Sequence, residues 1–417
     1  MHICFFAVGL PGSSYHGGAV TCWAIIREMV NRGHKVTILS LYDISNHNPY
    51  LKHRKEQEEE ISSIGVDIEY IEYEYEKIKS NHSKFENLIS IEKSIKYLWP
   101  WANLSENAEN IINKINPDFI FMYHFEPVAT YYFFKNKNIP TIGGMGDLWH
   151  LPGEFRNKFE NKGVISSLKT FYGSFLSKKA MKEICKDINI LGFFPAHYAE
   201  WFNKHSSRND VLYFRTPSHD NSLEKWKKLR ESLRTEKFKL LLMGDLNSTV
   251  TSIGIYEFAT LTLKFLDENI GKDNYEVHFV GGGNPPKGTE KYLLNRENII
   301  FRGRVYPPDD EFLSCNVMVV PTPITLGIRV RIVTAMSFGA PIVSHIANQA
   351  GIPELEHNHN CLLAKNAKEI GEFIFDIYKD FELQKRLENN SKKTFNDYFS
   401  EQKAAAKIVK LMEDYNG

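Results

Sequence analysis

The sequence predicts an α/β protein made of two doubly wound parallel sheets. Three observations support this fold class. Short apolar runs alternate with segments of helical periodicity, glycine-rich loops follow several of the runs, and the alternation starts again after a charged segment at 221–236. The chain has 417 residues, and at about 150 residues per domain this length fits two to three domains.

The first unit opens with a strand at 3–8, an unbroken apolar run of the kind that is buried on both faces of a parallel sheet. A loop of small residues follows at 9–18. A helix with apolar residues at three- and four-residue spacing comes next, Gly33 ends it, and a second strand lies at 36–39. Further strands are expected at 66–70, 119–122, 141–142, 188–191 and 211–214.

The second unit starts with a strand at 238–243, followed by Gly244. A helix over 252–268 and a strand at 277–280, which runs into three glycines at 281–283, continue the alternation. The remaining elements are strands at 299–301, 317–320, 342–343 and 362–363, and helices at 367–378 and 401–415.

Doubly wound sheets bind ligands beyond the carboxyl ends of their strands, so we expect the two domains to face a central cleft. The expected parts are an N-terminal Rossmann-like acceptor domain at 1–220, a linker at 221–236, a C-terminal Rossmann-like donor domain at 237–397, and a C-terminal helix at 398–417 that crosses back to the first domain.

Composition excludes several classes of function. Lys plus Arg and Asp plus Glu both number 51, so no overall positive field attracts nucleic acid. The five cysteines are widely spaced without a CxxC pair, which argues against disulfides or a zinc site and for a reducing compartment. No apolar run reaches the roughly 18 residues that a membrane span needs. We expect a cytoplasmic protein.

Glycine-rich loops follow three predicted strands, at 9–18, at Gly244 and at 281–283. Glycine lets backbone N–H groups approach an anionic ligand closely, and the following helix N-terminus adds partial positive charge. Each loop alone is equally consistent with a turn that binds nothing. Because both halves carry such a loop, a shared ligand site is the favoured interpretation.

Arg329 and Arg331 stand where the loop after the strand at 317–320 becomes a helix. Two guanidinium groups beside a helix N-terminus suit a phosphate or diphosphate, because their forked donors add to the helix dipole. The alternative is a solvated surface pair. A diphosphate site is the prediction.

This region resembles the C-terminal domain of GT-B-fold glycosyltransferases of the group-1, family-four kind. The family's pattern there is roughly G-x-G-T-R-[IL]-K-[IV]-L-E-A-M-A-x-G-x-P-V-V. The matching positions are Gly327, Arg329, Arg331, Ala335, Met336, Gly339, Pro341 and Val343.

The resemblance extends over most of the chain. Residues 301–305 (FRGRV) look like the family's F-x-G-x-V base-binding loop, and 351–355 (GIPEL) look like its G-[IV]-P-E-[LI] run. Similar runs stand at 360–364 (NCLLA), 17–19 (GGA) and 32–37 (RGHKVT). Several motifs in the family's order are specific for fold and class, but not for substrate.

The pattern and the resemblance together suggest three groups of site residues. Asp147, Arg329 and Arg331 are the expected catalytic residues. His124, which follows a predicted strand, is expected to contact the acceptor with Trp149 and His150, although a packed or solvated histidine is the alternative. Donor-binding residues are Gly17, Gly18, Gly244, Gly303, Val305, Gly327, Ile328 and Thr334.

Two departures from the family pattern concern the reacting groups. Gly146 stands where the family usually has a histidine that helps the reacting sugar. Leu326 and Thr334 replace two glutamates, the second of which normally grips the ribose hydroxyls of the nucleotide, and Thr334 offers one weaker hydroxyl instead.

No metal site is predicted, since the histidines show no H-E-x-x-H spacing and Asp-x-Asp does not occur. No resident cofactor is expected. The co-substrate implied by the resemblance is a nucleotide-diphosphate sugar, with UDP or GDP as the nucleotide.

Residues 156–186 combine Lys and Arg with interleaved large apolar residues. The resemblance implies that such a stretch docks on anionic lipid, which would place the protein peripherally on the inner face of the membrane. The alternative is a core-packing helix with a solvated basic face.

The prediction is therefore a hexosyltransferase-like enzyme, retaining and metal-independent, that moves a sugar from a nucleotide-diphosphate donor to a glycan or lipid-linked acceptor. Two alternatives stay open. One is a nucleotide-sugar-binding partner protein without turnover, which the two departures suggest, and the other is a nucleotide-sugar epimerase on the same fold.

Overall fold

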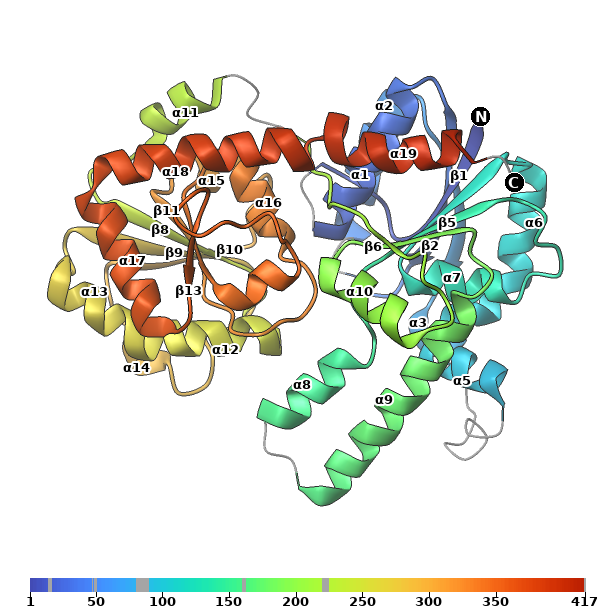
Figure 1. Ribbon diagram of the computed structural model, residues 1–417, viewed down its shortest axis with the longest axis horizontal. Coiled ribbons are helices and arrows are strands. Elements are labelled where there is room, and N and C mark those ends of the chain that lie inside the picture. The colour runs from blue at the N-terminus through green and yellow to red at the C-terminus, as the bar shows by residue number, and fades with distance from the viewer. Residues whose placement is uncertain are drawn as a thin grey trace. The chain divides into compact units, whose positions relative to one another are not determined.

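The computed structural model describes residues 1–13, 17–46, 48, 51–79, 90–159, 163–219 and 225–415. The chain forms two compact units (Figure 1). Unit 1 contains the described residues of 1–13, 18–215 and 405–415, and unit 2 contains residue 17 and the described residues of 216–404.

In unit 1 the described residues form a seven-stranded parallel sheet in the order β3-β2-β1-β4-β5-β6-β7. Strands β1 and β4 lie at its centre and are buried along nearly their whole length, as their apolar sequences require. The strands are β1 (His2–Val8), β2 (Lys35–Asp43), β3 (Asp67–Tyr73), β4 (Phe119–Tyr123), β5 (Thr141–Met145), β6 (Ile190–Phe193) and β7 (Leu212–Tyr213).

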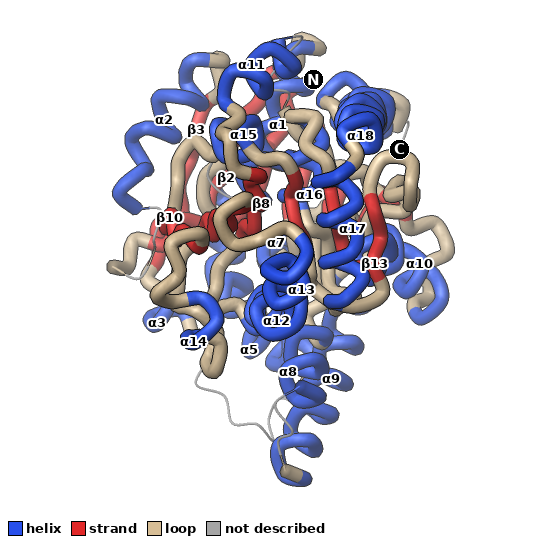
Figure 2. Tube along the Cα trace, turned by 90° about the vertical axis from the view of Figure 1, so that its left-hand side faces the viewer, coloured by secondary structure: helices blue, strands red, loops and turns tan. Residues whose placement is uncertain are grey.

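Helices pack around this sheet, and α8 and α9 form a hairpin that projects away from it (Figures 1 and 2). Tryptophan and phenylalanine fill the core between helices and sheet; Trp99 and Phe125, for example, are fully buried and stack. The helices are α1 (Gly17–Asn31), α2 (Arg54–Ser63), α3 (Tyr75–Ile78), α5 (Ile91–Leu98), α6 (Ser105–Ile115), α7 (Phe125–Tyr132), α8 (Leu151–Phe159), α9 (Val164–Ile184), α10 (Ala196–His205) and α19 (Ala406–Glu413).

Unit 2 holds a six-stranded parallel sheet in the order β10-β9-β8-β11-β12-β13. Its strands are β8 (Phe238–Met243), β9 (Tyr275–Val280), β10 (Ile299–Gly303), β11 (Val317–Val320), β12 (Ile342–His345) and β13 (Leu362–Ala364). Its helices are α11 (Trp226–Leu233), α12 (Thr249–Glu257), α13 (Leu263–Asn269), α14 (Glu290–Leu293), α15 (Asp309–Ser314), α16 (Val330–Ser337), α17 (Ala367–Lys379) and α18 (Phe381–Thr394).

Both sheets reverse their strand order at one point, between β1 and β4 in unit 1 and between β8 and β11 in unit 2. At such a point the loops that follow the two neighbouring strands run to opposite sides, which leaves a crevice beyond the strand ends. The fold class predicted from the sequence, two parallel-sheet Rossmann-like domains, is confirmed.

The structure refines several expected elements. The single helix expected at 252–268 consists of α12, a π-helical turn at Phe258–Thr262 and α13. Likewise, a π-helical turn at Glu401–Ala405 precedes α19. Helix α11 lies in the segment expected to be a linker and belongs to unit 2, whereas α19 belongs to unit 1.

Candidate functional site

Two of the predicted residues, Gly244 and Arg331, meet at the carboxyl end of β8. Gly244 follows this strand with a φ of +144°, and the guanidinium of Arg331 lies so close that any β-carbon at position 244 would collide with Nη1. A β-carbon at Gly281, after the neighbouring strand β9, would likewise collide with the carbonyl oxygen of Gly244. Only glycine permits this approach of two backbones and an arginine.

Hydrogen bonds between the two glycine loops fix their geometry. The backbone N–H of Leu246 donates to the carbonyl of Gly282 at 2.8 Å, and that of Asn284 donates to Oδ1 of Asn247 at 3.4 Å. Within the loop after β8, the N–H of Asn247 donates to the carboxylate of Asp245 at 2.9 Å. A β-carbon at Gly283 would lie 2.8 Å from Oδ1 of Asn247. The loops after β8 and β9 therefore form one connected rim at the edge of the sheet.

Burial of Arg331 is unusual for a charged group. Its guanidinium is enclosed although the residue is only half-buried overall, and its Nε has no hydrogen-bond partner among the described residues. Burial, and after it the charge of Arg329, lowers the pKa of Arg331 to about 9. Like charges are costly to enclose without an anion, so this arrangement is suited to an anionic ligand.

A third guanidinium borders the same rim and was not among the predicted site residues. Arg304 follows β10, and a β-carbon at Gly282 would lie 2.8 Å from its Nε. Its Nη2 lies 3.8 Å from the carboxylate of Asp245. Its position directly after a predicted strand and a glycine was a signal that could have identified it.

The other predicted donor-binding residues of unit 2 lie on neighbouring segments. Gly303 ends β10 with a φ of +66°, and Val305 packs against the core of unit 2. Gly327 has a φ of +64°, Ile328 packs against the same core, and both precede α16. The hydroxyl of Thr334 donates to the carbonyl of Val330 at 3.3 Å, which leaves its oxygen free only to accept.

His124 lies at the strand-order reversal of unit 1, directly after β4. Its backbone has a φ of 73° and a ψ of −179°, a combination that is rare outside glycine and costs about 1–3 kcal/mol. Its N–H donates to the carbonyl of Gly144 at 2.9 Å, and its ring fills the space beside Gly146. Strain of this kind persists where the surroundings hold the residue in place.

Tyr123, whose ring lies 4.2 Å from that of His124, is acted on by two nearby carboxylates. Asp147 is exposed next to Gly146. The pKa of Tyr123 is raised, chiefly by burial, with contributions from neighbouring groups that include Asp147 and Glu126. Burial raises the pKa of Glu126 itself to about 7, and its Oε2 has no hydrogen-bond partner among the described residues.

A carboxyl group with a pKa near neutrality can take up or release a proton, which makes Glu126 a candidate acid or base. Glu126 was not among the site residues predicted from the sequence. The available signal was its place in the first turn of α7, two positions after a strand end.

Trp149 and His150 point into unit 1. Trp149 packs against Trp99, with ring centroids 5.3 Å apart. His150 is only 4% exposed and lies beside Trp201. Its pKa is lowered to about 4, by burial first and then by the charge of Lys178, so the ring is neutral near pH 7. The acceptor role of both residues stays a prediction.

The loop after β1 is held by side chains of α2. Gln57 donates to the carbonyl of Leu10 at 3.2 Å, and the backbone N–H of Ser13 donates to the carboxylate of Glu60 at 3.2 Å. Gly17 and Gly18 begin α1, and both are half-buried. Residues 14–16 of the predicted glycine loop lie outside the described residues.

The described ranges of the chain contain no group of three or more His, Cys, Asp or Glu side chains arranged to hold a metal ion. Within the same ranges, no helix is both long and apolar enough to cross a bilayer.

Comparison with known proteins supports the resemblance noted in the sequence. Residues 259–380 match a family model described as "Glycosyl transferases group 1". No curated protein matches the chain. The group-1 glycosyltransferase resemblance is thus confirmed for the larger part of unit 2.

Solved structures resemble the whole chain in fold. A glycosyltransferase from Rickettsia africae is 12% identical with a TM-score of 0.65, covering 100% of this chain and 99% of its own. HepE of Anabaena, solved with UDP-glucose, is 14% identical with a TM-score of 0.63. The match covers 99% of this chain and 100% of HepE. TarM of S. aureus, solved with UDP, is 10% identical with a TM-score of 0.67. The match covers 99% of this chain and 100% of TarM.

At these identities the likeness shows the fold alone and says nothing about the substrate. The family match and the fold together indicate an enzyme of the glycosyltransferase class.

Proposed function

We propose that this chain transfers a sugar from a nucleotide-diphosphate sugar to a glycan or lipid-linked acceptor, with retention at the sugar and without a metal ion. The observation that carries the proposal is the enclosed guanidinium of Arg331 against Gly244, at the strand-order reversal of unit 2. A diphosphate placed there would meet positive charge and backbone N–H groups together.

Arg329 and Arg331 would act on the leaving group. As the bond between sugar and diphosphate breaks, negative charge grows on the departing diphosphate. Guanidinium groups already held in position stabilise that charge without reorganising, and they do so most strongly in an enclosed site. Arg331 has the required enclosure and lacks a hydrogen-bond partner for Nε among the described residues.

The nucleotide would extend from the diphosphate toward the residues carried over from the family pattern. Gly303 and Val305 would contact the base, and Thr334 would accept one hydrogen bond from the ribose, since its own proton is used within α16. Arg304 adds positive charge at the rim beside Gly282. The nucleotide would be UDP or GDP; HepE and TarM were solved with UDP-glucose and UDP, respectively.

The acceptor would be held in unit 1 by His124 and Asp147, which lie beyond the carboxyl ends of β4 and β5. His124 fills the space where the family's histidine side chain would start, so an imidazole is present there although position 146 is glycine.

We also propose that the α8–α9 hairpin docks on a membrane with anionic lipid, on the cytoplasmic side. Leu168, Phe171 and Phe175 of α9 are 64%, 74% and 58% exposed and recur at three- and four-residue spacing, which places them on one helix face. Lys179 is exposed one turn further along this face. Apolar residues followed by a cation are typical of a helix that lies in a bilayer interface.

Two of the predicted lipid-contacting lysines have partners within unit 1. Lys178 pairs with Glu154 at 3.0 Å, and Lys182 lies 5.8 Å from the ring of Trp201. Residues 160–162 and the side chains of 156–159, 164 and 165 lie outside the description. The proposal of membrane docking therefore rests more on the exposed apolar residues of α9 than on its lysines.

A partner protein that binds a nucleotide sugar without turnover is the second candidate. The hydroxyl of Thr334, engaged with Val330, is the specific observation in its favour, because it offers the ribose only a weak acceptor.

Product analysis by mass spectrometry separates the candidates. The full chain is incubated with UDP- and GDP-sugars and a panel of glycan and lipid acceptors, with and without EDTA. Transfer that persists in EDTA supports the first proposal. Binding without any product supports the partner protein, a changed donor sugar without acceptor supports an epimerase, and activity restored only by added metal contradicts metal independence.

A further inference from the structure

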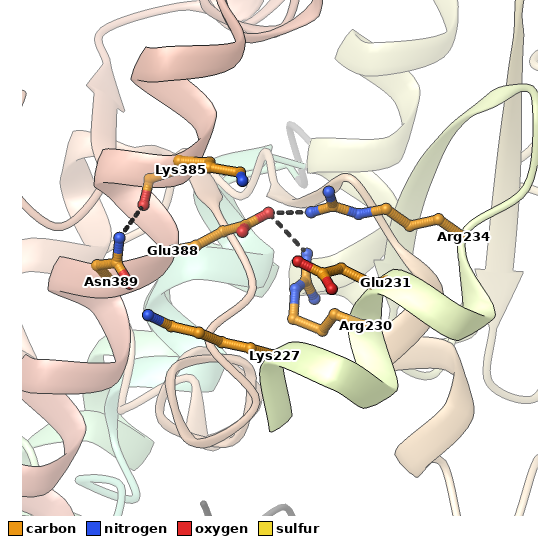
Figure 3. A pocket seen from close by; sticks show the side chains of 7 residues that line it. All are labelled: Lys227, Arg230, Glu231, Arg234, Lys385, Glu388 and Asn389. Atoms are coloured by element: carbon orange, nitrogen blue, oxygen red, sulfur yellow. Dashed lines mark hydrogen bonds and ion pairs between the residues drawn. The ribbon is translucent and has the colours of Figure 1, made fainter. Parts of the chain in front are cut away.

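A second charged site lies in unit 2, on elements that carry none of the residues assigned above. It is a hollow of about 70 Å³, partly open to solvent, between α11 and α18 (Figure 3). Its lining consists of Lys227, Arg230, Glu231, Arg234, Lys385, Glu388 and Asn389. We call it the α11–α18 pocket.

The floor of the pocket is rigid. Arg230 is 1% exposed and donates from Nη1 to the carbonyl of Phe312 at 2.8 Å and from Nη2 to that of Cys315 at 2.7 Å. Both guanidinium groups of the floor, those of Arg230 and Arg234, also meet Oε1 of Glu388. The two arginines are thus locked around one carboxylate and the end of α15.

Positive charge nevertheless exceeds negative charge there. Glu388 is the only carboxylate that contacts the arginines among the described residues, and their buried Nε atoms have no hydrogen-bond partner in that set. The rim adds the exposed Lys227 and Lys385. Neither forms an ion pair with a carboxylate of the described residues. Four cations against the two carboxylates Glu231 and Glu388 leave a surplus of two positive charges.

We propose that the α11–α18 pocket binds a dianionic oxyanion, namely a phosphate group. A surplus of two charges matches the charge of a phosphate monoester, and Asn389 adds an amide at the rim. The rim ammonium groups approach from α11 and α18, so a phosphate would bridge the two helices. The phosphate source is either the free ion or a phosphorylated metabolite.

Both helices also touch the end of α16, the helix that starts at the proposed diphosphate site. Trp226 of α11 fills the space beside Gly339, directly after α16. From α18, Lys392 donates to the carbonyl of Ser337, and the hydroxyl of Ser391 donates to that of Ala340 at 3.2 Å. Bridging α11 and α18 would stiffen the support of α16.

The test is calorimetric titration of the full chain with inorganic phosphate, and separately with glycerol phosphate. The double variant Lys227→Ala/Lys385→Ala should weaken binding by about tenfold or more per lysine, since each loses a charge-assisted contact. Lys228→Ala/Arg386→Ala is the matched control, because both residues are exposed on the same helices but do not line the pocket. Glu231→Gln should tighten binding by removing a like charge.

The outcomes are distinct. Equal weakening of phosphate binding in both double variants would show only a long-range effect of net charge and would overturn the proposed site. Absence of phosphate binding to the parent chain would overturn it too. Arg329→Ala/Arg331→Ala should leave phosphate binding intact, because these residues belong to the proposed diphosphate site; loss in this variant alone would assign the phosphate to that site instead. Tighter binding of glycerol phosphate through the same lysines would identify a metabolite as the source.

Discussion

The imidazole ring of His124 occupies the space beside Gly146 into which a side chain at position 146 would project. This contact explains why position 146 departs from the pattern of the family that the chain resembles. A histidine at 146 and His124 in its observed conformation cannot both fit. The backbone of His124, with a φ of 73°, holds the ring in this place.

Gly146→Ala should therefore destabilise the protein by about 1–3 kcal/mol, because the added methyl group forces the ring of His124 out of a packed position. Urea unfolding measures the loss. In the double variant His124→Gly/Gly146→Ala the methyl group has room and the strained φ is relieved, so the alanine should cost much less there. An equal cost in both backgrounds would show that the ring is not the obstacle.

Arg331→Ala should lower turnover by about a hundredfold or more, as removal of one preorganised oxyanion donor does. Arg329→Ala should act in the same direction, and Arg331→Lys should be milder because it keeps a positive charge. Thermal stability without ligand should not fall, since enclosure beside Arg329 disfavours the charge of Arg331. Steady-state kinetics and a melting curve of each variant provide the test, and normal turnover in both alanine variants would place the diphosphate elsewhere.

Thr334→Glu should tighten donor binding by about 1.5–3 kcal/mol, the worth of one hydrogen bond to a charged group. The reason is that Thr334 accepts weakly, whereas a glutamate at this position can accept from both ribose hydroxyls. Thr334→Gln is the control without charge. Calorimetry with UDP and GDP measures the change, and unchanged or weaker affinity would mean that the nucleotide is held differently.

Acid should unfold unit 2 partly through Glu311. Burial alone raises the pKa of this carboxyl, but hydrogen bonds with His278, Lys239 and Arg302 outweigh it and lower the pKa to about 2. The stabilisation is therefore complete above the ordinary value near 4.5 and is lost as the pH falls from there toward 2.

The test compares Glu311→Gln with the parent chain across pH. At pH 7 the variant should lose about 3–5 kcal/mol, because it leaves the buried Lys239 unpaired. The gap in unfolding free energy should narrow below pH 4.5, and a gap that stays constant would contradict the assignment of the shift to Glu311.

Membrane docking should depend on the apolar face of α9. Phe171→Ser/Phe175→Ser should abolish most sedimentation with anionic vesicles, because both side chains are exposed and would insert. Lys179→Ala should cost about 1 kcal/mol, the value of one surface charge near anionic lipid. Leu261→Ser, a 58% exposed leucine of unit 2, is the matched control. Equal sedimentation of the double variant and the parent would favour a solvated helix face.

The sequence alone indicated the two parallel-sheet units and most of their strands, but not helix α11 in the expected linker. Alternating apolar runs and helical segments indicate which parts are strands of a parallel sheet, since a fully apolar run such as that of β1 is stable only when both of its faces are covered. It also placed Gly244 directly after a strand and Arg331 at the start of a helix. These features are local, and they can be read from spacing and residue type.

Only the tertiary structure decided which side chains meet and how their neighbours alter them. The contact of Arg331 with Gly244 joins residues far apart in the chain, and so does that of Arg304 with Gly282. The same holds for burial, which sets the pKa of Glu126 near 7 and that of His150 near 4. Desolvation depends on everything packed around a group, and no pattern within one segment records it.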